Sequence, residues 1–287
     1  MTVLEAIQKS TEFLAKRGVE PPRLQAELLL AHVLKLPRMK LYLNFERVLT
    51  VPETDALREL VRRRGTREPL QHITGSVSFC GYEMTVNRAV LVPRPETELL
   101  AEAGWQMLTG LNRPATALDW CTGSGCLAIA LAAKHPAVQV TATDLSPEAL
   151  AVAEKNAAAN GVAERIRFLA GDGFAALAQV AEPEGRQFDL IVTNPPYIPS
   201  AEIAELEPEV REFDPRLALD GGGDGLDFYR RLAVEAGEYL RPDGRLMAEF
   251  GDGQAPAVKK MLEDEKWIVE AVRADYSQRD RFLIARR

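Results

Sequence analysis

The sequence predicts an α/β fold in which a small helical-bundle domain precedes a seven-stranded sheet that ends in an antiparallel hairpin. Three observations lead to this prediction. The first 75 residues have a helical pattern, and strand-like and helix-like segments alternate from about residue 115. The last two strand-like segments, 267–273 and 281–286, are separated by a polar loop without a helix. Alternation produces a parallel sheet with helices on both faces, whereas the last two strands should pair antiparallel.

Length and composition are those of an ordinary globular protein. The 287 residues suggest about two domains, and 46% hydrophobic with 27% charged residues is typical. No apolar run approaches the ~18 residues of a membrane helix, and the first ten residues lack the apolar core of a signal peptide. Three cysteines are too few for a disulfide framework, and three scattered histidines argue against a zinc site. We therefore expect a cytoplasmic protein without membrane contact or bound metal.

Residues 1–75 are predicted to form the first domain. Val3, Ile7 and Leu14 mark one helical face, Pro22 suits the first turn of a second helix, and Thr50 can cap a third. A bundle this small would expose an apolar face unless that face serves a partner. The domain is therefore a candidate for docking another molecule.

The net charge of −7 is unevenly distributed along the chain. Residues 1–75 hold 13 Lys and Arg against 9 Asp and Glu, whereas residues 76–287 hold 22 against 33. The overall acidity argues against a protein that only binds nucleic acid. The basic first domain, with Arg62, Arg63 and Arg64 in succession, could face an acidic partner or RNA, although a solvated surface is the simpler interpretation.

Residues 76–92 change from helical to alternating spacing. Val77 and Phe79, then Tyr82 and Met84, alternate around Gly81, which predicts a β-hairpin linker. Residues 93–287 form the second predicted domain. Before its terminal hairpin, strands are expected at 115–120, 138–143, 166–170, 188–193 and 245–250.

A glycine-containing loop follows the first strand of this domain. Glycines there let the backbone approach a ligand closely, and the helix that starts at residue 126 offers free N–H groups. The spacing of these glycines also fits the fingerprint of dinucleotide-binding proteins. A tight turn that binds no ligand is a further interpretation. The loop residues predicted to bind a cofactor are Cys121, Thr122, Gly123, Ser124 and Gly125.

Carboxylates end the next two strands. Asp144 ends the strand at 138–143, 19 residues after Gly125, where a carboxylate can accept both ribose hydroxyls of an adenosine cofactor. Asp172, followed by Gly173, comes directly after the third strand and could read the adenine amino group. A helix N-terminal charge and a simple turn are the alternative roles of the two aspartates.

The most informative motif, Asn194-Pro195-Pro196-Tyr197, follows the strand at 188–193. Two prolines remove two N–H donors and stiffen the loop. The Asn194 side-chain carbonyl and the Pro195 main-chain carbonyl can then accept both N–H bonds of one planar amide or amino group. Tyr197 offers a flat face on which that planar group can lie. A proline-rich turn without function is the alternative interpretation.

This combination resembles amino-methyltransferases that depend on S-adenosylmethionine (SAM), whereas NAD enzymes lack the Asn-Pro-Pro-Tyr element. Further segments resemble the HemK/PrmC family, the N5-glutamine methyltransferases of peptide chain release factors. The resemblance runs over nearly the whole chain and is carried by residues 69–75, 91–98, 213–219, 221–229, 249–251 and 254. The segments after Pro93 are specific, and the first 65 residues match mainly in length and character.

The resemblance implies a Rossmann-like methyltransferase fold, SAM as methyl donor and S-adenosylhomocysteine (SAH) as product. It also implies that the substrate is the glutamine of the Gly-Gly-Gln motif in class 1 release factors. Asn194, Pro195 and Tyr197 would be catalytic, and these three with Pro196 would bind the substrate; Asn194 would also contact the cofactor. We expect a monomer that positions its substrate without a metal or a catalytic triad, and that binds no nucleic acid stably.

Three other functions are also compatible with the sequence. The loop at Cys121, where many methyltransferases have Gly, also resembles the enzymes that methylate a glutamine of a ribosomal protein. An adenine N6-methyltransferase of nucleic acid would need a basic groove and a target-recognition region. A SAM-sensing module without catalysis would have no need of Asn194 and Tyr197.

Overall fold

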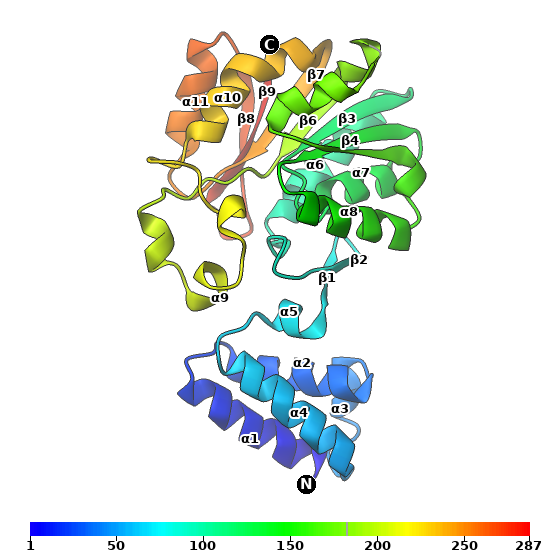
Figure 1. Cartoon of the computed structure of the whole chain (residues 1–287), viewed down its shortest axis with the longest axis vertical. Coiled ribbons are helices and arrows are strands. Elements are labelled where there is room, and N and C mark those ends of the chain that lie inside the picture. The colour runs from blue at the N-terminus through cyan, green and yellow to red at the C-terminus, as the bar shows by residue number, and fades with distance from the viewer. Residues whose placement is uncertain (182) are drawn as a thin grey trace. The chain divides into compact units, whose positions relative to one another are not determined.

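The computed structural model describes residues 1–181 and 183–287 (Figure 1). The chain divides into two compact units. A helical unit consists of Met1–Ser76 with Leu206–Phe213, and a sheet unit consists of Val77–Glu205 with Asp214–Arg287. The inclusion of Leu206–Phe213 in the helical unit differs from the predicted organisation, in which only residues 1–75 formed the first domain.

Local sequence signals account for the main helices of the helical unit. The Thr2 and Thr50 side chains each accept a hydrogen bond from the third residue of their helix, and Glu5 and Glu53 complete the two capping boxes. The short helices α3, α5 and α9 were not predicted. The helices of this unit are α1 (Val3–Lys16), α2 (Pro22–Leu34), α3 (Arg38–Leu41), α4 (Val51–Arg64), α5 (Leu70–Thr74) and α9 (Pro208–Arg211).

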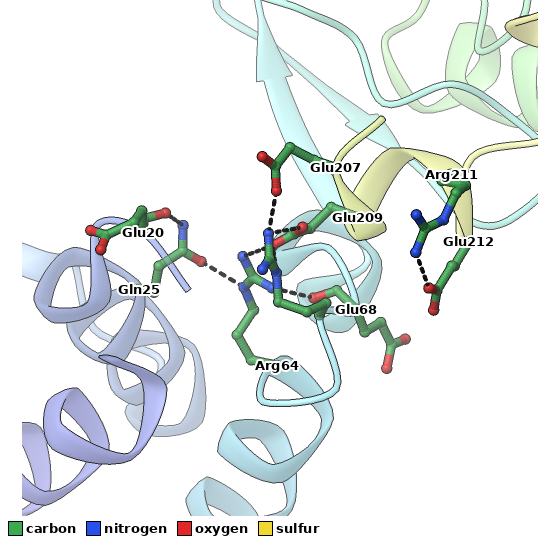
Figure 2. A network of polar contacts seen from close by, with 9 residues as sticks. Glu20, Gln25, Arg64, Glu68, Glu207, Glu209, Arg211 and Glu212 are labelled. Carbon is green, nitrogen blue, oxygen red and sulfur yellow. Dashed lines mark hydrogen bonds and ion pairs between the residues drawn. The ribbon is translucent and has the colours of Figure 1, made fainter. Parts of the chain in front are cut away.

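A cluster of ion pairs ties α9 to the rest of the helical unit (Figure 2). Arg64 is only 4% exposed; its Nη2 lies 2.8 Å from Glu209 Oε1, and its Nε donates to Gln25 Oε1 at 3.0 Å. Arg67 Nε donates to the same Glu209 oxygen at 2.6 Å. The suggestion that Arg62, Arg63 and Arg64 together face a partner is therefore wrong for Arg64, because its charge is used inside the unit.

We expect Arg64→Leu to lower the free energy of unfolding of the helical unit by about 2 kcal/mol, because the partly buried Glu209 loses one of its two cationic partners among the described residues and keeps Arg67. Urea unfolding followed by circular dichroism measures this change. The matched control is Arg62→Leu, since the Arg62 side chain is 65% exposed and pairs only with Glu59 of its own helix among the described residues. Equal midpoints for the two variants would contradict a structural role for Arg64.

The sheet unit contains the predicted seven-stranded sheet in the order β5-β4-β3-β6-β7-β9-β8. The first five strands in this order are parallel, whereas β9 is antiparallel to both β7 and β8, as predicted. A separate two-stranded sheet forms at the predicted hairpin. The strands are β1 (Ser76–Phe79), β2 (Tyr82–Thr85), β3 (Ala115–Trp120), β4 (Val138–Asp144), β5 (Ile166–Ala170), β6 (Phe188–Thr193), β7 (Leu240–Glu249), β8 (Ile268–Ala274) and β9 (Asp280–Arg286).

Helices cover the two faces of the large sheet and bury two apolar cores (Figure 1). Alternate residues of β3 show the division: Ala115 and Ala117 pack on one face, and Leu118 and Trp120 on the other. On the first face lie α6 (Thr97–Gly110), α7 (Cys126–Lys134) and α8 (Pro147–Ala159). On the second face lie α10 (Asp227–Glu235) and α11 (Ala255–Asp264).

Strand register brings the predicted site loops together. In the sheet, Trp120 at the end of β3 is the partner of Thr143 in β4 and of Thr193 in β6. Asp144 at the end of β4 is in turn the partner of Ala170 in β5. The chain order reverses between β3 and β6, and such switch points at the carboxyl ends of parallel strands are where ligands bind in α/β proteins.

Across the part of the chain that the structure describes, no helix combines the length and the apolar character needed to cross a bilayer.

Candidate active site

A pocket opens at the carboxyl edge of the parallel strands, within the sheet unit. Most of the predicted cofactor residues line it. They are Cys121, Thr122, Gly123, Ser124, Asp144, Asp172, Gly173 and Asn194. Pro196 of the Asn-Pro-Pro-Tyr motif also lines the pocket, whereas Pro195 and Tyr197 are outside the set of lining residues among those described.

The loop after β3 is fixed by main-chain hydrogen bonds to β4. Thr122 N donates to Thr143 O at 2.9 Å, and Gly123 N donates to Asp144 Oδ2 at 2.8 Å. Gly123 has φ +55°, and a Cβ added to it would meet no described heavy atom within 4 Å beyond its chain neighbours. The loop backbone is therefore held in place while one side stays accessible to a ligand.

Gly125 is the exception among the predicted loop residues, because it does not line the pocket among the described residues. It is the N-cap of α7 with φ +81°, and a Cβ there would lie 3.0 Å from the Ala153 Cβ of α8. The structure thus gives Gly125 a packing position between two helices. Close helix packing is therefore a sufficient reason for glycine at this position, and the predicted contact between Gly125 and a cofactor stays a prediction.

Asp144 holds two loops at once. Its Oδ2 accepts from Gly123 N, and its Oδ1 accepts from Ser146 N at 2.9 Å, at the start of α8. Burial raises the pKa of this carboxyl, and the N–H groups of Ser146 and Gly123 partly oppose that shift. Each carboxylate oxygen has a further lone pair, so Asp144 can still accept hydrogen bonds from hydroxyl groups of a ligand in the pocket.

Asp119 was not singled out from the sequence, although it supports the same loop. It is fully buried near the end of β3, where its Oδ2 accepts from Thr122 Oγ1 at 2.6 Å and from Ala128 N at 3.0 Å. Burial raises its pKa to about 7. A carboxylate inside a buried strand, two residues before the loop, is the signal that could have identified it.

One pocket wall combines aromatic and charged groups. The Trp120 ring stacks on Phe174 with centroids 5.3 Å apart, and the Arg231 guanidinium lies 5.6 Å from the Trp120 ring centroid. Arg231 Nη1 also donates to Asp172 Oδ1 at 2.6 Å. A Cβ on Gly173 would lie 2.9 Å from Trp120 Nε1, so only glycine fits beside this ring. Asp172 therefore lines the pocket as one member of an ion pair.

Cys121 has φ +65°, a conformation that favours glycine, and it lines the pocket. A glycine would adopt this conformation without strain, because it has no Cβ. Burial raises the pKa of the Cys121 thiol well above the usual range. The thiol is therefore neutral at physiological pH and acts as a small apolar part of the lining.

Hydrogen bonds to Gln254 and Thr97 anchor the Asn194-Pro195-Pro196-Tyr197 loop. Gln254 Nε2 donates to Tyr197 O at 2.9 Å, and Gln254 Oε1 accepts from Gly251 N at 2.9 Å. Asn194 Nδ2 donates to Thr97 Oγ1, at the start of α6, at 3.2 Å. Because its amide nitrogen is used in this way, the Asn194 Oδ1 atom is the group left to accept a hydrogen bond from a ligand.

The sequence did not predict the remaining wall. It comes from residues before α6 and from the segment that follows the helical unit's α9 along the chain. Arg94 Nη2 lies 2.8 Å from Asp214 Oδ2, and burial raises the pKa of Asp214 to about 6. The apolar members of this wall are Val90, Leu91, Pro93, Pro215, Leu217 and Phe228.

The lining fits an adenosyl cofactor. It offers two carboxylates, apolar and aromatic walls, and an open glycine loop at the start of α7. In addition, two buried polar atoms of the lining residues, Trp120 Nε1 and Thr143 Oγ1, have no hydrogen-bond partner among the described residues. Buried polar atoms without partners mark places where a ligand or water can bind.

Two family models match this chain. Residues 5–75 match the PrmC N-terminal domain, and residues 99–206 match the methyltransferase small domain. The release factor glutamine methyltransferase of Geobacter sulfurreducens is 46% identical, covering 91% of this chain and 88% of that protein. The one from Chlorobaculum tepidum is 44% identical and covers 98% of this chain and 96% of its own length.

A solved structure shares the fold. The N-terminal domain of human METTL16, in complex with SAH, has a TM-score of 0.51 at 18% identity. The match covers 72% of this chain and 76% of that chain. At this level of identity the likeness concerns the fold alone.

Proposed function

The chain belongs to the release factor glutamine methyltransferases, and from this premise we propose its reaction in detail. The enzyme transfers the methyl group of SAM to the side-chain amide nitrogen of the glutamine in the Gly-Gly-Gln motif of class 1 peptide chain release factors. The observation that supports this most is the position of Asn194. It lines the same pocket as the glycine loop and Asp144, and its carbonyl oxygen accepts no hydrogen bond from the residues that the structure describes.

The reaction needs a positioned nucleophile. An amide nitrogen is weakly nucleophilic because its lone pair is delocalised into the carbonyl. When bound, SAM supplies an activated methyl group on a positively charged sulfur. A C–S bond breaks, an N–C bond forms, and the amide nitrogen loses one proton, so the products are SAH, methylated glutamine and H⁺.

The residues of the loop act by orientation in this proposal. Asn194 Oδ1 and the main-chain carbonyl of Pro195 accept the two N–H bonds of the glutamine amide, and the ring of Tyr197 supports its plane. Pro196 keeps the loop stiff. Alignment of the nitrogen with the methyl group can contribute several kcal/mol, about 7–11 at best. No metal and no catalytic triad take part.

The partner is proposed to dock on the helical unit as a folded protein. This unit holds 14 Lys and Arg against 12 Asp and Glu, and a positive excess complements an acidic surface. Arg64 is excluded from that surface, because it is buried and paired with Glu209. The enzyme is proposed to work as a monomer, without stable binding of nucleic acid.

The substrate class is tested with labelled SAM and five purified acceptors: two class 1 release factors, a ribosomal protein with a known methylated glutamine, adenine-containing DNA and adenine-containing RNA. We expect label in the release factors alone. Label in the ribosomal protein and not in the release factors would show that the enzyme methylates a glutamine of a ribosomal protein instead. Label in nucleic acid without label in protein would overturn the glutamine proposal.

A further inference from the structure

Asn194 has an amide group, and its two ends differ in chemistry although their shapes are nearly the same. The substrate needs the carbonyl end as an acceptor, whereas the NH₂ end would meet the N–H bonds of the glutamine with like polarity. Something in the fold must therefore distinguish the two orientations. Thr97 Oγ1, which accepts from Asn194 Nδ2 at 3.2 Å, is the first group to consider.

A hydroxyl alone cannot fix this orientation, since it can donate as well as accept. Glu249 removes the ambiguity. It ends β7 and is 1% exposed; burial raises its pKa, and hydrogen bonding from Thr97 and Asn194 opposes that rise and favours the ionised form. An ionised carboxylate only accepts, so the Thr97 hydroxyl donates its hydrogen bond to Glu249, and the lone pairs of the Thr97 oxygen are left to accept from the NH₂ end of Asn194.

We propose that Glu249 and Thr97 are positioning residues that hold the Asn194 side chain with its carbonyl oxygen toward the substrate amide. This rests on the proposed function, because it assumes that Asn194 accepts from the glutamine. Neither residue contacts the reacting atoms in this account. Both act by orienting the amide group of Asn194. Residues that only stabilise the fold would not need to fix this orientation.

Several charged and titratable groups influence the carboxyl group of Glu249. Burial raises the pKa of Glu249 to about 7, although hydrogen bonding from Thr97, the charge of Arg281 and hydrogen bonding from Asn194 lower it. The charge of Glu96 raises it. The hydroxyls of Tyr197 and Tyr229 also belong to this environment, since the Glu249 charge raises the pKa of both.

Protonation of Glu249 creates a donor where there was only an acceptor. A protonated Glu249 can donate to Thr97 Oγ1, which can then donate to Asn194, so the flipped amide becomes as well satisfied as the productive one. Because the folded-state pKa is raised, the ionised form that fixes the amide is lost as the pH falls through about 7. Methyl transfer should therefore decline toward acidic pH.

The test uses full-length enzyme with Thr97→Val, Thr97→Ser and Glu249→Gln, at saturating SAM and with an intact release factor. We expect Thr97→Val and Glu249→Gln to lower kcat about 10-fold, with the KM for the release factor and the affinity for SAH within about 3-fold of wild type. Thr97→Ser keeps the hydroxyl and should stay within about 3-fold. Thr109→Val is the matched control, because Thr109 lies in the same helix and donates to Trp105 O at 2.7 Å, outside the site.

The pH profile separates orientation from general damage. Wild type and Thr97→Ser should show an acidic limb in kcat with a midpoint near 7, and Glu249→Gln should lack it. A limb retained in Glu249→Gln, or full activity of Thr97→Val, would overturn the proposal. The profile is measured at saturating SAM because burial also raises the pKa of Asp119, at the glycine loop, to about 7. A change in SAM affinity on titration of Asp119 then does not enter kcat.

A second readout does not depend on activity. The side-chain NH₂ resonances of Asn194, assigned in ¹⁵N spectra by their loss in Asn194→Ala, should shift with pH around 7 in wild type and stay constant in Glu249→Gln. Resonances that titrate alike in both proteins would contradict the orientation account. If wild-type enzyme methylates no Gly-Gly-Gln glutamine, the proposed function fails, and this measurement still decides whether Glu249 orients the amide.

Discussion

Asn194→Ala is expected to lower kcat for methyl transfer to a release factor by at least about 100-fold, because the substrate amide loses the acceptor that aligns its nitrogen. Among the described residues, Asn194 is the member of the Asn-Pro-Pro-Tyr motif whose side chain both lines the pocket and carries a free carbonyl oxygen. A single-turnover assay at saturating SAM measures the chemical step directly.

Two controls make this result specific. Binding of SAH, followed by calorimetry, should stay within a few-fold of wild type, which shows that the pocket remains folded. Asn112→Ala removes the same group from an exposed loop after α6, where Asn112 Nδ2 donates only to Gly110 O among the described residues, and should keep full activity. Activity of Asn194→Ala within a few-fold of wild type would contradict catalysis by positioning at this loop.

Asp144→Ala should weaken SAH binding by roughly 30- to 100-fold, the second largest effect that we expect. The carboxylate accepts from Gly123 N and Ser146 N, so its loss frees two loops of the pocket in addition to removing acceptors for the ligand. Hydrogen bonds to a charged group contribute about 1.5–3 kcal/mol each, and about 1.4 kcal/mol corresponds to a factor of ten.

The matched control for Asp144 is Asp252→Ala, since the Asp252 side chain is 65% exposed and pairs with Arg279 away from the pocket. Calorimetric titration of both variants with SAH, beside their unfolding temperatures, separates lost affinity from lost stability. An unchanged affinity in Asp144→Ala would show that the end of β4 does not hold the cofactor, and the assignment of the pocket would have to be revised.

The sheet and most of the cofactor site could be predicted because their signals are local. Strands of apolar residues alternate with helices that carry their own start signals, such as Ser146 before α8. In a parallel sheet, strand ends meet at one edge, so loops far apart in the sequence converge without further information. Asp144, Asp172 and Asn194 could therefore be placed together from sequence position alone.

The other features depend on contacts between distant segments. Leu206–Phe213 joins the helical unit because Arg64 and Arg67 pair with Glu209, and no local pattern announces such pairs. Gly125 fits the fingerprint equally well as a ligand contact or as a packing residue, and its proximity to Ala153 appears only in the folded chain. Glu249 belongs to a segment that supported the resemblance, yet its relation to Thr97 appears only when β7 and α6 lie together.

The most direct test of the central claim locates the methyl group on the acceptor. A class 1 release factor, intact or with its Gly-Gly-Gln glutamine changed to alanine, is incubated with the enzyme and SAM, digested, and fragmented by mass spectrometry. The account predicts one methyl group on the side-chain amide nitrogen of that glutamine and none on the alanine form. A methyl group at any other residue, or on both forms, would contradict it.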